Sequence, residues 1–141
     1  MRKTILSVLL FTGLISCEKD TNSPQINSGL TGTWQWIRTD GGFAFHIHES
    51  PSTTGNTYLL KFIDENKMVI YENNTEILSG DYTIEKEKSI YSGEMEDYIV
   101  VTGEYRIQSI VINGIIMIDQ NSLSISDNCY DGIGSSYKRI E

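Results

Sequence analysis

Two polar clusters contain the side chains that could carry out chemistry. In the first, His46-Ile47-His48-Glu49, two imidazoles alternate with an apolar residue and precede a carboxylate. On a strand, His46 and His48 would share one face and could bind a metal, with Glu49 or a distant aspartate as a third ligand. The segment lies in a polar, glycine-rich connection, and no third ligand stands at a diagnostic spacing. We therefore predict no metal site, with His46 and His48 as the only candidates.

The second cluster, Asp127-Asn128-Cys129-Tyr130-Asp131-Gly132, places a thiol among carboxylates. Negative charge disfavours the thiolate that a nucleophile requires. Turn chemistry accounts for the asparagine, aspartate and glycine, and neither a neighbouring base nor an oxyanion donor is visible. The spaced oxygen ligands of a calcium loop are also missing. We therefore expect no catalytic residue, no cofactor and no enzymatic activity.

Aromatic side chains are spread along the whole chain and form a third candidate site. They could line an apolar cavity, with tyrosine hydroxyls as polar contacts to a small hydrophobic ligand. They could equally fill the interior of a small barrel as its core. The residues that we predict to contact a ligand are Trp36, Tyr58, Phe62, Tyr82 and Tyr105.

Strands must position these side chains, because apolar and polar residues alternate from residue 30 onward with Gly, Asn, Asp and Ser between the runs. No helical stripe is visible. Turn residues at 64–66 and 73–74 indicate hairpins, and Asn113-Gly114 predicts a two-residue hairpin. We interpret residues 86–97 as a loop or the frayed end of a hairpin. The pattern predicts strands at residues 33–38, 57–63, 67–71, 80–85, 98–102, 104–112, 115–118, 122–126 and 135–140.

Eight or nine short strands joined by tight turns indicate an antiparallel meander, and closure into a barrel removes its exposed edges. We therefore predict an all-β protein, an antiparallel up-and-down barrel of eight strands (8–9) over residues 30–141. A two-sheet sandwich has the same periodicity and is the alternative.

The N-terminal residues indicate export. Met1-Arg2-Lys3 is a basic start, and the apolar stretch Thr4–Ile15 is too short to cross the roughly 30 Å hydrocarbon core of a membrane. Leu14-Ile15-Ser16-Cys17 resembles the lipobox of bacterial lipoproteins, in which the cysteine is acylated before cleavage. The resemblance implies a signal peptide over residues 1–16 and lipidation, such as palmitate, at Cys17.

An ordinary cleavage site close to Cys17 is the alternative, and Cys129 would then be the only available disulfide partner. Residues 17–29 are rich in Asn and Ser and indicate a flexible tether. Glu18-Lys19-Asp20 resembles the export signals of Bacteroidota lipoproteins. It implies attachment to the outer membrane of the cell envelope, on its periplasmic or its cell-surface face.

Gly32-Thr33-Trp34 at the start of the first expected strand resembles the opening motif of lipocalins. The segment Gly80-Asp81-Tyr82-Thr83-Ile84 and the ending Tyr137-Lys138-Arg139 are similar to small lipocalin-like lipoproteins of Bacteroidota. The resemblance implies a lipocalin-like barrel in which Arg139 packs over Trp34 and closes one end. Arginine stacks well on indole, with a contribution of about 0.5–2 kcal/mol.

Charge limits the classes of partner. The chain of 141 residues has a formal net charge of −8, and loss of Arg2 and Lys3 with the leader lowers it to −10. Such an acidic protein lacks the cations that supply affinity for nucleic acid, so we predict that nucleic acid is not a partner.

We expect a lipid-anchored envelope protein that binds a small hydrophobic ligand in its barrel. The alternative is an interaction or inhibitor module with a filled barrel, an envelope protein as partner, and a functional loop rim at residues 41–56 and 86–97.

Overall fold

Burial alternates along the strands as the sequence pattern predicts. In β3, Tyr58, Leu60 and Phe62 are buried, whereas the residues between them are partly or fully exposed. The computed structural model describes residues 29–103 and 106–141. Its elements are β1 (Gly32–Gly41), η1 (Phe43–Phe45), β2 (Ile47–Glu49), α2 (Pro51–Thr54), β3 (Tyr58–Phe62), β4 (Lys67–Glu72), β5 (Thr75–Lys88), β6 (Met95–Val101), β7 (Gly114–Asp119), β8 (Ser122–Ser126) and β9 (Ile133–Arg139).

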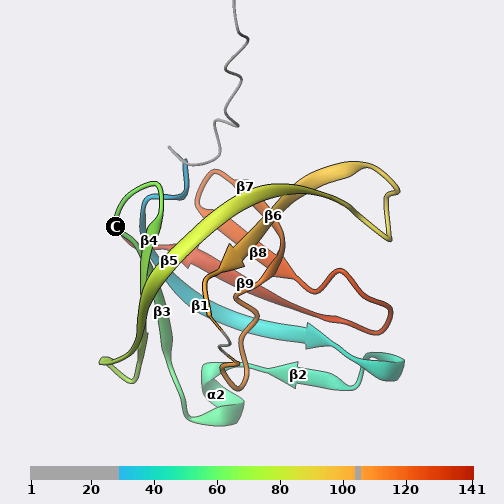
Figure 1. Ribbon diagram of the computed structural model, residues 1–141. Helices are drawn as coiled ribbons and strands as arrows, with labels where there is room; N and C mark the ends of the chain where they lie inside the picture. Colours follow the sequence, from blue (N-terminus) through green and yellow to red (C-terminus); the bar gives the residue numbers. More distant parts are fainter. Residues whose placement is uncertain (1–28, 104–105) are drawn as a thin grey trace, which may run out of the picture.

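The strands form a closed antiparallel barrel (Figure 1). From β3 to β9 each strand pairs with the next along the chain, and β1 pairs with both β3 and β9, which closes the eight-stranded ring. The short strand β2 is a ninth strand, paired with the end of β1. The predicted all-β, up-and-down barrel is therefore confirmed. A two-sheet sandwich is excluded, because all the strands belong to one continuous sheet that the pairing of β1 with β9 closes.

Residues 104–112 were predicted as a strand, and this prediction is wrong for residues 106–112, the part of it that the structure describes. β6 ends at Val101 and β7 begins at Gly114, so Asn113-Gly114 is not a two-residue hairpin either. The backbone of Ser109 has a φ of +74°, which interrupts an extended chain. Residues 106–113, here called the plug segment, instead pack against the core of the barrel, with Ile110, Val111 and Ile112 buried.

Gly114 marks the point where the chain leaves the plug segment and enters β7. Its φ of +155° is rarely adopted by other residues, and a Cβ atom at this position would collide with the carbonyl oxygen of Ser126. A glycine is therefore required for the close approach of β7 to β8, not for a tight hairpin.

Residues 86–97 form an ordered hairpin. β5 extends to Lys88 and β6 begins at Met95, so only the residues between them are turn. β6 pairs with β7 only at Tyr98 and Ile99. The hairpin end, residues 88–96, therefore projects away from the neighbouring strand (Figure 1), and it is called the hairpin tip below.

Candidate functional site

The predicted ligand-binding residues lie inside the barrel, where their rings contact one another. Trp36, Tyr58, Phe62 and Tyr82 are each about 1 % exposed. Trp36 meets Tyr58 edge to face at 5.4 Å between ring centroids, and Phe62 meets Tyr82 in the same way at 5.1 Å. The fifth candidate, Tyr105, lies outside the described residues. Four of the five rings therefore pack as core.

The hydroxyl groups expected to meet a ligand already have partners in the protein. The Tyr58 hydroxyl donates to Glu72 Oε1 at 2.7 Å, and the Tyr82 hydroxyl donates to the Asp64 carbonyl at 2.8 Å. Burial, reinforced by the Glu72 contact, raises the pKa of Tyr58 to about 12. Burial, with the charges of Asp64 and Glu65, also raises the pKa of Tyr82 to about 12.

A hydrogen-bond network joins the plug segment to the inner face of the barrel. The Val111 amide donates to Ser135 Oγ at 2.8 Å, and the Tyr137 hydroxyl donates to the Val111 carbonyl at 2.7 Å. Thr39 Oγ1 donates to the Ser109 carbonyl at 2.6 Å and accepts from Trp36 Nε1 at 3.0 Å. The 2.6 Å contact between Thr39 and Ser135 is then donated by Ser135, so these hydroxyls are all satisfied.

Arg139 and Trp34 meet near the N-terminal end of β1. The guanidinium carbon lies 4.1 Å from the centroid of the fully buried indole. Arg139 also donates to the carbonyls of Thr31, at 2.7 Å, and Gly29, while Trp34 Nε1 donates to the Leu30 carbonyl at 2.8 Å. The chain before β1 is thereby held across this end of the barrel, in the arrangement expected for Trp34 and Arg139.

The two histidines do not share a strand face. β2 begins at Ile47, so His46 precedes it, and the Nδ1 atom of His46 contacts the carbonyl of Phe43 at 2.5 Å. His48 Nδ1 lies 2.9 Å from an oxygen of Asp40. Within residues 29–103 and 106–141, no group of three His, Cys, Asp or Glu side chains is placed to hold a metal ion.

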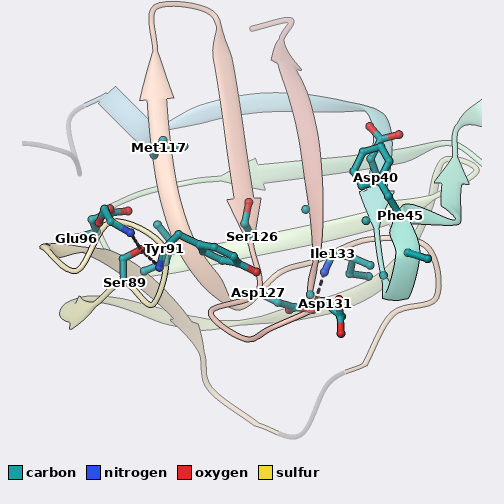
Figure 2. A pocket seen from close by; sticks show the side chains of 17 residues that line it. Asp40, Phe45, Ser89, Tyr91, Glu96, Met117, Ser126, Asp127, Asp131 and Ile133 are labelled. Carbon is teal, nitrogen blue, oxygen red and sulfur yellow. Dashed lines mark hydrogen bonds between the residues drawn. The ribbon is translucent and has the colours of Figure 1, made fainter.

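A groove of about 670 Å³ lies at one end of the barrel, and none of the four buried candidate rings lines it. Figure 2 shows the hairpin tip with Tyr91 and Glu96 on one side and Asp40 with Phe45 on the other. The strands β7, β8 and β9 and the loop after β8 lie between them. Three regions distant in sequence, residues 40–45, 89–96 and 126–134, therefore form one depression together with β7.

The groove combines an apolar surface with an acidic rim. Ile115 and Met117 project from the face of β7 opposite to the core residue Ile116. Its apolar lining also includes Phe45, Tyr91 and Ile133, and its carboxylates are Asp40, Glu96, Asp127 and Asp131. No lysine, arginine or histidine is among the described residues that line it.

Side-chain contacts fix one wall of the groove. Asn128 accepts a hydrogen bond from the Ile90 amide at 2.9 Å and donates to Glu87 at 2.9 Å and to the Lys88 carbonyl at 3.0 Å. The Tyr91 hydroxyl donates to the Cys129 carbonyl at 2.5 Å. The hairpin tip is therefore bound to the loop after β8, and Cys129 itself is a free, exposed thiol.

The sequence prediction found only part of this groove. The expected rim, residues 41–56 and 86–97, includes Phe45 and the hairpin tip, but it omits β7 and the loop after β8. The sequence contains one sign of the groove. Ile115 and Met117 are apolar, although a strand with only one buried face would have polar residues at these positions. Cys17, the expected leader (residues 1–16) and the expected tether (residues 17–29) except Gly29 lie outside the described residues.

None of the helices in the described part of the chain has the length and hydropathy needed to cross a membrane. Comparison with known proteins found no match to a protein-family model, a curated protein or a solved structure.

Proposed function

We propose that this protein is a lipid-anchored, non-enzymatic interaction module of the cell envelope, which binds another protein through the groove at the rim of its barrel. The observation that carries the proposal is the contrast between the two candidate sites. Inside the barrel, the four described candidate rings are core and the tyrosine hydroxyls have partners. At the rim, Met117, Phe45 and Tyr91 are exposed around a groove.

The barrel serves as a rigid scaffold in this proposal. Binding residues are often placed on loops that a rigid framework positions, and here the hairpin tip is tied to the loop after β8 through Asn128 and Tyr91. A groove that is fixed before binding loses little conformational entropy when the partner docks. The Cys17 lipid and the tether would hold this surface near the membrane, in reach of other envelope proteins.

A site-specific cross-linking experiment tests the proposal. A photoreactive amino acid replaces Met117, which is 59 % exposed in the groove, in the full-length lipoprotein expressed in its native host. The matched control carries the same group at Ile63, which is 52 % exposed and lies outside the groove. We expect a protein adduct at Met117 that is missing at Ile63.

Two outcomes would contradict the proposal. Equal adducts at both positions would indicate random encounters. The absence of adducts, combined with a small molecule that stays bound to the purified full-length protein in native mass spectrometry, would favour the other function, a hydrophobic ligand held by the barrel.

A further inference from the structure

We infer that the groove receives a basic, amphipathic segment of the partner protein, with an apolar side chain against Met117 and Ile115 and a lysine or arginine against the acidic rim. The inference rests on the proposed function and specifies the chemistry of its partner. Charge complementarity, the continuity of the surface and the exposed rings at its edge support it.

The charge argument concerns the carboxylates that have no cationic partner in the part of the chain that the structure describes. Asp40 is paired with Arg38 at 2.9 Å, so its charge is largely compensated. Glu96 accepts a hydrogen bond from the Ser92 hydroxyl, and Asp127 accepts one from the Ile133 amide at 3.3 Å. Neither contact supplies positive charge. Together with the exposed Asp131, they give the groove a negative field that attracts a cation and repels an anion.

The shape argument concerns Met117. Beyond this side chain the surface continues into a second depression of about 660 Å³, over the outer faces of β7, β8 and β9 and the bulge of β1 at Ile37. Met117 lines both depressions, and Arg38 and Lys138 line the second beside a single carboxylate, Asp119, so the cation of the partner belongs in the first. The serines of β8 on this face are small, so a chain can lie close to the strands. A path of this length suits an extended segment better than a compact small molecule.

The exposed aromatic rings are a second reason to expect a cationic side chain in the partner. Phe45 is 64 % and Tyr91 65 % exposed, and they stand on opposite sides of the groove. An ammonium or guanidinium group is attracted to the face of an aromatic ring as well as to a carboxylate. A lysine or arginine entering between these walls would therefore meet both kinds of partner.

Three synthetic peptides test the inference. All share a leucine-phenylalanine-leucine centre and blocked ends, and carry two lysines, two glutamines or two glutamates on each side. Binding to the full-length lipoprotein in nanodiscs of zwitterionic lipid is measured by calorimetry, with empty nanodiscs as the blank. We expect the lysine peptide to bind at least about tenfold more tightly than the glutamine peptide, with no detectable binding of the glutamate peptide. Raising the salt concentration should reduce the difference.

Variants locate the binding. The double variant Glu96→Gln/Asp131→Asn should lose the preference for lysine, whereas Glu65→Gln/Glu76→Gln removes two exposed carboxylates outside the groove and should retain it. Met117→Ser should weaken the lysine and glutamine peptides by similar factors, because it removes an apolar contact that both share.

Equal affinity for the lysine and glutamine peptides, no binding of any peptide, or a lysine preference that survives Glu96→Gln/Asp131→Asn would each overturn the inference. The cross-linking result separates this failure from that of the proposed function. If the Met117 adduct persists, the groove still binds a protein, but through a segment of different chemistry. If it is absent as well, both proposals fail.

Discussion

The hydroxyl of Thr39 shows how individual polar atoms are accommodated in an aromatic core. It accepts from Trp36 and Ser135 and donates to the Ser109 carbonyl, so one small side chain satisfies three groups. Unsatisfied, each buried group would cost about 1–3 kcal/mol. At the scale of residues, the barrel interior is therefore a packed and hydrogen-bonded core.

The buried tyrosines make stability sensitive to high pH. Because burial raises the pKa of Tyr58 and Tyr82 from 10 to about 12, the folded state favours the neutral phenols. Their contribution is complete below pH 10 and is lost as the pH rises through 12. We expect the free energy of unfolding in urea to fall over this range, and to fall less in Tyr58→Phe/Tyr82→Phe. If the free energy of unfolding of this double variant fell as steeply with pH as that of the unaltered protein, the two buried tyrosines would not be the cause. Tyr130→Phe, which alters an exposed tyrosine, is the control.

Arg139 is predicted to stabilise the barrel through Trp34 and the chain before β1. Arg139→Gln should lower the free energy of unfolding by about 1–3 kcal/mol, because it removes the contact with the indole and weakens the bonds to the Thr31 and Gly29 carbonyls. Lys138→Gln removes the same charge from an exposed neighbour and should change little. Chemical unfolding followed by tryptophan fluorescence measures both, and equal losses would refute the assigned role.

At the scale of elements, the plug segment takes the place of a strand. Its residues Ile110, Val111 and Ile112 bury apolar surface in the barrel, but the backbone of Val111 bonds to the side chains of Ser135 and Tyr137 instead of a neighbouring strand. β6 and β7 therefore pair only near Tyr98 and Ile99. The hairpin tip, which is not paired with β7, is instead bound to the loop after β8 and forms one wall of the groove.

Ser135 should be essential for holding the plug segment. Ser135→Ala leaves the Val111 amide without its acceptor, and we expect a loss of about 1–3 kcal/mol and faster hydrogen exchange at this amide. Ser136→Ala is the matched control, because Ser136 is the next residue of β9 and alternates to the other face. Exchange measured by NMR distinguishes them. Equal exchange rates at Val111 in the two variants would show that the serine is dispensable.

At the scale of the whole molecule, a filled barrel carries an acidic groove on its outside and a candidate lipid anchor at Cys17. The two cysteines of the chain allow a clean test of the anchor. In the native host supplied with a labelled fatty acid, the unaltered protein and Cys129→Ser should incorporate the label, and Cys17→Ser should not, because it lacks the acylated thiol. Incorporation of the label by Cys17→Ser, or its absence from the unaltered protein, would refute lipidation at Cys17.

The sequence by itself determined most strands and their antiparallel order, and its resemblance to lipocalins implied the contact of Arg139 with Trp34. The strands follow from alternation and turn residues, which are local in the chain. It could not distinguish a strand from the plug segment, because apolar residues such as Ile107, Ile110 and Ile112 would be buried in either structure. Only the tertiary structure decided that four of the predicted rings are buried in the core and that Met117 lines one groove with Tyr91 and Phe45. The physical reason is that a groove arises from contacts between segments far apart in the chain, such as Ile90 with Asn128, and no local pattern encodes them.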